Sequence, residues 1–124
     1  MRKAIQTEKA PAAIGSYSQA IQAGGVVYLA GQIPLDPKTM NLVAGDLRAQ
    51  VVRVFENMKA VAEAAGGNLD RVVKLTVYLM DLSSITVVNE VIADYFKQPY
   101  PARTSIQVAG LPKNAVVEIE AVMI

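Results

Sequence analysis

The sequence predicts an α+β fold in which two helices pack on one face of a mixed β-sheet. Three observations favour this class. Two stretches have the spacing of amphipathic helices, about five or six others read as strands, and the hydrophobic 52% of residues is almost entirely aliphatic, with only 6% aromatic. The 124 residues contain no linker-like stretch. We therefore expect a single domain that spans residues 1–124.

The first predicted element is a β-hairpin over residues 19–33. Two short extended runs meet at Gly24 and Gly25, where glycine readily supplies the positive φ of a tight turn. Residues 34–45 then collect Pro, Asp, Asn and Gly, which predicts a loop.

The first helix is predicted to begin after Asp46, which is suited to cap it, and to end at Gly66 or Gly67. Its apolar residues recur at steps of three and four, with charged residues on the opposite side. The predicted inward stripe consists of Leu47, Val51, Phe55, Met58, Ala62 and Ala65.

A strand follows over residues 72–80. Alternation places Val73 on one face together with the other odd-numbered apolar residues, Leu75, Val77 and Leu79. The second face is also largely apolar, so we expect both faces of this strand to be buried.

The second helix is predicted over residues 84–97, with Ser83 or Ser84 as its cap and two following prolines as its stop. Its predicted inward stripe consists of Val88, Val91, Ile92, Tyr95 and Phe96.

The last two strands are predicted over residues 103–109 and 116–123, joined by the turn-like GLPKN. If they pair as an antiparallel hairpin, Ser105 lies opposite Glu118 and Arg103 opposite Glu120. This register would put a guanidinium, a hydroxyl and carboxylates on one surface, with an anion close to Arg103. The alternative interpretation is a simple cross-strand Arg–Glu pair, worth about 0.2–1 kcal/mol at an exposed site.

Two helices on one face leave the other face of the sheet uncovered. Because the 72–80 strand is apolar on both sides, that face would be an exposed apolar patch unless another chain covers it. We therefore expect a homo-oligomer.

Composition restricts the chemistry. The chain has no Cys and no His, which excludes disulfides, thiol nucleophiles, histidine triads and most transition-metal sites. No metal site is expected. The net charge of +1, with Lys and Arg scattered singly, gives no reason to expect nucleic acid or a membrane as partner. The N-terminus lacks a signal-peptide core and no stretch could span a bilayer, so a cytoplasmic protein is expected.

Five linked motifs resemble the RidA/YjgF family of reactive intermediate deaminases, from about Ile5 to Val122. They are "APAAIGSYSQAI", "GQIPLDP", "VVKLTVYLMDL", "VNEVIADYF" and "YPARTSIQVAGLPKNAVVEIEA". The resemblance implies a chorismate-mutase-like fold and a homotrimer with sites between subunits. It also implies cofactor-free hydrolysis of 2-aminoacrylate, its tautomer 2-iminopropanoate and similar 2-imino carboxylates to 2-keto acids and ammonia.

The resemblance also implies roles for individual residues. Arg103 matches the carboxylate-binding arginine, and Glu118 matches the acid that handles water or the imine nitrogen. Tyr17 matches a pocket tyrosine that could close the pocket or donate a proton, Gly31 a glycine beside the ligand, and Asn89 a helix asparagine near the site.

Three positions depart from the family pattern. Ala30 replaces a common serine, Ser105 a cysteine and Gly110 a frequent arginine. The backbone N–H of Ser105 would remain available to a substrate oxygen. These departures bear on substrate range more than on the reaction.

Structural alternatives stay open for several of these residues. Gly31 could simply permit a bulge or a sharp strand end, and Asn89 could be a helix residue that makes a hydrogen bond. Tyr17 could be a partly buried tyrosine with a satisfied hydroxyl. The protonation of Glu118 is also open, because burial raises the pKa of a carboxyl whereas a neighbouring Arg103 lowers it.

Three functions remain distinguishable. The first is the imine deaminase, in which Arg103 orients the substrate and Glu118 supplies general acid/base catalysis. The second is a chaperone-like trimer or binding module that holds a 2-keto acid or another small carboxylate without turnover. The third is a ribonuclease, against which the near-neutral charge and the absence of His argue.

Overall fold

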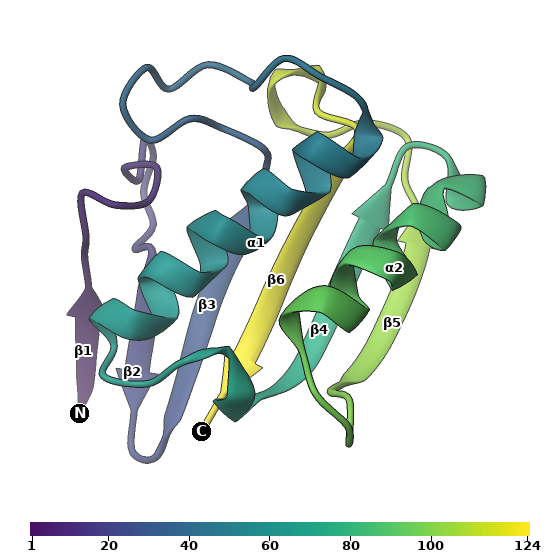
Figure 1. Ribbon diagram of the computed structural model, residues 1–124. Helices are drawn as coiled ribbons and strands as arrows, with labels where there is room; N and C mark the ends of the chain where they lie inside the picture. The colour runs from purple at the N-terminus through teal and green to yellow at the C-terminus, as the bar shows by residue number, and fades with distance from the viewer.

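The computed structural model describes residues 1–124 and contains one six-stranded mixed sheet with both helices on the same face (Figure 1). The strand order is β1-β2-β3-β6-β4-β5, and only the β4–β5 pair is parallel. The predicted fold class is confirmed. The elements are β1 (Arg2–Ile5), β2 (Ala20–Ala23), β3 (Val26–Gln32), α1 (Leu47–Ala64), β4 (Val72–Leu79), α2 (Ile85–Tyr95), β5 (Ala102–Gln107) and β6 (Val117–Met123), with short 3₁₀ turns η1 (Leu69–Arg71), η2 (Leu82–Ser84) and η3 (Pro112–Asn114).

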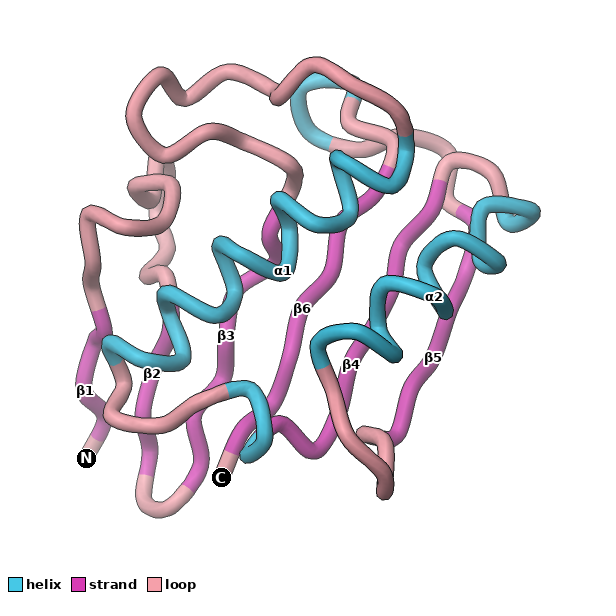
Figure 2. The backbone as a smooth tube through the Cα atoms, in the orientation of Figure 1, coloured by secondary structure: helices cyan, strands magenta, loops and turns pink.

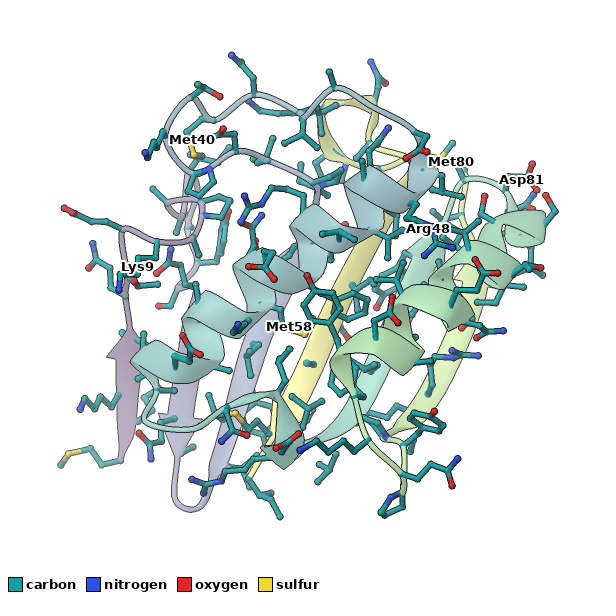
Figure 3. The ribbon with its side chains drawn as sticks, in the orientation of Figure 1. Lys9, Met40, Arg48, Met58, Met80 and Asp81 are labelled. Atoms are coloured by element: carbon teal, nitrogen blue, oxygen red, sulfur yellow. The ribbon has the colours of Figure 1, made fainter.

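Both helices lie on one face because both are crossover connections in the same direction. α1 connects β3 to β4 and α2 connects β4 to β5, each step moving toward the same edge of the sheet. Right-handed crossovers of this kind place their helices on the same side. Twenty-four buried residues fill the space between the helices and the sheet, among them Met58, which lies between α1 and the strands in Figure 3. Neither helix has the length and apolar character needed to cross a membrane.

Local signals placed the hairpin and the first helix correctly. Gly24 adopts φ +60° in the β2–β3 turn. Asp46 accepts a hydrogen bond from the N–H of Ala49 at 2.9 Å, which is an N-cap. Gly66, at φ +86°, and Gly67 donate their N–H groups to carbonyls in the last turn of α1, which is the pattern of a Schellman motif.

One strand was missed and two predictions of detail are wrong. β1 was not predicted, because its Arg2 and Lys3 face solvent at the sheet edge. Val73 is 42% exposed instead of buried, because a register shift between Val72 and Lys74 turns it to the other face. Ser84 makes no capping bond; Asp81 instead accepts from the backbone and hydroxyl of Ser83 and starts the turn that leads into α2.

The predicted β5–β6 hairpin is also wrong. β6 lies between β3 and β4, whereas β5 pairs in parallel with β4 at the edge. The GLPKN segment is a crossing loop whose Lys113 and Asn114 have positive φ. β6 buries four side chains under the helices and β5 has only one half-buried residue, so the more apolar strand occupies the centre.

The long loops gather at one end of the sheet (Figure 2). The loop after β3 and the loop before β6 meet there, where the Nζ of Lys113 donates to the carbonyl of Met40 at 2.9 Å. The segment between β1 and β2 lies beside them, and together these loops surround a cavity.

Candidate functional site

The first candidate site is a cavity of about 450 Å³ at this end of the sheet. Tyr17, Ala30, Gly31 and Glu118 all line it, so the structure brings together four of the residues selected by the resemblance. Its other lining residues are Pro11, Ala12, Ile14, Gly15, Gln19, Gln32, Ile33, Leu35, Pro112 and Lys113.

Glu118 is the carboxylate of this cavity. It is half-buried on β6, on the sheet face that the helices leave open. Burial, and then the negative charge of Glu120 two residues along the same strand, raises the pKa of Glu118 above its usual range. No cation is near enough to reverse this, so the predicted influence of Arg103 on the pKa of Glu118 is absent within one chain.

Gly31 makes room for this carboxylate. A Cβ at Gly31 would lie 3.0 Å from Cδ of Glu118 and closer still to one of its carboxylate oxygens. The pairing of β3 with β6 also shifts register between Leu29 and Gln32. The bulge expected in the alternative interpretation is therefore present, and it brings the backbone against the acid.

Tyr17 lies on the loop between β1 and β2, and its side chain is 53% exposed. Its hydroxyl accepts a long hydrogen bond from the N–H of Ile14 at 3.4 Å. The ring forms part of the cavity wall. Ala30, beside Gly31, contributes a methyl group where a serine would contribute a hydroxyl.

Arg103 lies in a second cavity of about 390 Å³ on the helix-covered side of the sheet. Its Nη1 donates to Oδ1 of Asn89 on α2 at 2.6 Å. This partner is a neutral amide, the arginine is exposed, and no carboxylate of the same chain forms an ion pair with it. The other lining residues are Leu75, Ile92, Ala93, Tyr100 and Pro101.

Arg103 and Glu118 point to opposite faces of the sheet. Arg103 pairs with Leu75, a residue buried under the helices. Glu118 pairs instead with Tyr78, which is on the open face. The predicted register that placed Arg103, Ser105 and the glutamates on one surface is wrong, because β4 separates β5 from β6 and the odd-numbered residues of β5 face the helices.

Ser105 presents two polar groups near Arg103. Its Oγ is buried and has no hydrogen-bond partner. Because Val108 donates its N–H to the carbonyl of Leu79, and backbone direction alternates along a strand, the N–H of Ser105 points away from β4 at the free edge of the sheet. This N–H is a ready donor beside the guanidinium.

The other residues that line the cavity were not selected from the sequence, and two of them, Gln19 and Lys113, are polar residues with hydrogen bonds to its loops. Gln19 is 3% exposed and hydrogen-bonds the loop that carries Tyr17, and Lys113 lines the cavity from η3. Nothing in a single Gln within the hairpin pattern distinguishes it from a surface residue. The structure contains no group of three or more Asp, Glu, His or Cys side chains placed to hold a metal ion.

The chain is similar to known proteins over nearly its whole length. A family model described as endoribonuclease L-PSP matches residues 7–124. A RutC family protein of Pyrococcus horikoshii is 51% identical over 98% of this chain and 97% of its own length. The human 2-iminobutanoate/2-iminopropanoate deaminase is 44% identical over 100% of this chain and 90% of its own. A crystal structure of RidA from a Psychrobacter species superposes with a TM-score of 0.94 at 55% identity, covering 98% of both chains. These matches span essentially the whole chain, and it belongs to the RidA/YjgF family.

Proposed function

We propose that this protein hydrolyses 2-imino carboxylates, such as 2-iminopropanoate and 2-iminobutanoate, to 2-keto acids and ammonia. The observation that carries the proposal is that the two residues needed for the reaction lie apart within one chain. An arginine with an unpaired anion-binding surface and a half-buried glutamic acid lie in separate cavities on opposite faces of one chain. Relatives at 42% and 44% identity are named for this deaminase activity.

In the proposed assembly, the β5 edge of one copy meets the Glu118 cavity of the next. The Arg103 cavity contains no acid, and the one cation that lines the Glu118 cavity, Lys113, donates its Nζ to the carbonyl of Met40. Three copies arranged head to tail around an axis would close such a ring, and each interface would then hold one complete site. The uncovered sheet face, with Tyr28 at 53% and Ile106 at 42% exposure, supplies apolar surface for that contact.

Arg103 would fix the substrate carboxylate. Asn89 holds one guanidinium nitrogen, which leaves other N–H groups of the planar fork for two parallel bonds to the carboxylate. The N–H of Ser105 adds a third donor on the same side. This orientation presents C2 of the imine to the neighbouring copy's glutamate.

Glu118 would transfer the protons. Water attacks C2 of the protonated imine while the Glu118 carboxylate takes one of the water's protons, which gives a carbinolamine. Glu118 then returns this proton to the nitrogen of the carbinolamine. The C–N bond breaks as the hydroxyl oxygen becomes the keto oxygen, and the hydroxyl proton leaves with ammonia as ammonium. A pKa raised by burial and by Glu120 brings this carboxyl closer to neutral pH, where one group serves best as both base and acid.

A mixing experiment tests both the reaction and the division of the site. An amino-acid oxidase generates the imine, and keto-acid release is followed with and without the protein. We expect Arg103→Ala and Glu118→Gln each to abolish the acceleration. When the two inactive variants are unfolded together, refolded and reassembled, about one quarter of the sites should regain both residues, because each site draws its two chains at random. Activity in either single variant, or none in the mixture, would contradict the proposal.

A second candidate is binding of 2-keto acids without turnover. It is favoured by Ala30, which removes a hydroxyl from the cavity wall. Calorimetric binding of pyruvate that depends on Arg103, in a protein without any deaminase activity, would establish this function instead. The ribonuclease activity named in the family model would require RNA binding with a steep salt dependence, which the net charge of +1 does not favour.

A further inference from the structure

Gln19 is the most heavily hydrogen-bonded side chain in the protein, and it lies directly before β2. It is 3% exposed. Its Oε1 accepts from the N–H of Thr7 at 2.7 Å. Its Nε2 donates to the carbonyls of Thr7 at 3.0 Å, Ala10 at 3.3 Å and Pro11 at 2.8 Å. An amide nitrogen has two hydrogens, so these three carbonyls share them.

These bonds connect the loop at residues 7–18 to the sheet. The other hydrogen bonds of this loop are internal to it, such as those from Lys9 to Thr7 and from Ile14 to Tyr17. Gln19 is thus the hydrogen-bonded link between the loop and the folded body. Ala10 and Pro11 are buried, so their carbonyls would find no water in its place.

The same residue is tied to the floor of the cavity. The backbone carbonyl of Gln19 accepts from the N–H of Ala30 at 3.0 Å, next to the glycine that makes room for Glu118. The loop held by its side chain contributes Tyr17 and four other residues, Pro11, Ala12, Ile14 and Gly15, to the cavity wall. Gln19 therefore sets the position of the cavity wall relative to Glu118.

We propose that Gln19 is a positioning residue for deamination, which holds the Tyr17 loop closed over Glu118. This inference rests on the proposed function. Without the amide, the loop opens while the sheet and both helices stay folded, because no strand or helix hydrogen bond uses this side chain. Opening moves Tyr17 away from the substrate and lets bulk water into the cavity, and misplacement of about 1 Å can cost about 10²-fold in rate.

Loop opening is measured by trypsin. Lys9 is exposed on this loop (Figure 3), and cleavage after it requires the surrounding segment to leave its place. Gln19→Met preserves the length of the side chain and removes its hydrogen bonds. We expect trypsin to cut after Lys9 at least about tenfold faster in this variant than in the wild type, at temperatures where both are folded. Gln19→Glu, which keeps the acceptor and loses the donors, should behave similarly and serves if the first variant does not fold.

Val61→Ala is the matched control. Val61 is fully buried on α1 and contacts the core, so this variant loses stability without touching the loop's hydrogen bonds. It should show wild-type cleavage after Lys9. A Gln19→Met variant that is cut no faster than Val61→Ala would overturn the inference.

A double-mutant cycle separates positioning from a general loss of stability. We expect kcat/KM to fall about 10²-fold in Gln19→Met, and to fall much less when the same change is made in a Tyr17→Ala background. Equal losses in both backgrounds would overturn the positioning role. If wild type and Arg103→Ala are alike in activity, the proposed function fails, and the trypsin comparison still decides whether Gln19 holds the loop.

Discussion

Replacing Gly31 by alanine should remove activity while leaving the fold nearly intact. The reason is the position of Glu118, whose Cδ and Cγ would lie 3.0 and 3.1 Å from the new Cβ. Non-bonded carbon atoms rest about 3.5–4.0 Å apart. The backbone at Gly31 is not among those with positive φ, so the conflict is with the carboxylate and not with the conformation of the chain.

The cost divides between stability and catalysis. Glu118 has a flexible side chain on a cavity, so it can rotate away at the cost of a strained rotamer, about 0.5–1.5 kcal/mol. Its carboxylate then no longer occupies the place where water would be activated. General acid/base catalysis contributes about 10²- to 10⁴-fold, and we expect kcat to fall by about 10²-fold or more.

The assay measures keto-acid release from an imine formed in situ, together with thermal unfolding of the same samples. Gly25→Ala, in the β2–β3 turn, is the control, because a Cβ there meets nothing within 4 Å and its φ is not positive. That variant should keep wild-type activity and stability. Full activity in Gly31→Ala would refute the reasoning, because the space that Gly31 leaves for the carboxylate would then have no bearing on the reaction.

Three further changes test the surroundings of the site. Glu120→Gln removes a negative charge that raises the pKa of Glu118, so the pKa of Glu118 should fall and the acidic limb of the kcat/KM profile should move to lower pH. An unmoved limb would contradict the assignment of Glu118 as the proton-transferring group. Asn89→Leu removes the 2.6 Å hydrogen bond that orients Arg103, and steady-state kinetics should show a raised KM for the imine, whereas an unchanged KM would leave Asn89 a structural residue. Asp46→Ala removes the N-cap of α1 and should cost about 1 kcal/mol, visible as a melting temperature about 4 °C lower with unchanged kcat.

Features fixed by a few neighbouring residues were predictable. Asp46 and Gly66 define the ends of α1 through bonds to groups within one turn, and Gly24 forms the hairpin turn through its own backbone freedom. The face of α1 that contacts the sheet follows from helical periodicity. These features depend on local geometry, which the residue order carries directly.

The candidate site was only partly predictable. The motifs selected Tyr17, Ala30, Gly31 and Glu118, which the structure gathers around one cavity. Gln19 was missed because the carbonyls that its amide binds lie 8 to 12 residues away, in a loop with no regular structure.

The sequence by itself determined the class of fold, the two helices, the hairpin and the family. The tertiary structure decided which strands are neighbours, and with that the relation of Arg103 to Glu118. Alternation along a strand tells which residues share a face of that strand, but not which strand lies beside it. The choice of neighbour depends on burial across the whole sheet, where the apolar residues of β6 take the centre and β5 is left at the edge. Because β5 pairs with β4 and not with β6, Arg103 and Glu118 lie on opposite faces of the sheet.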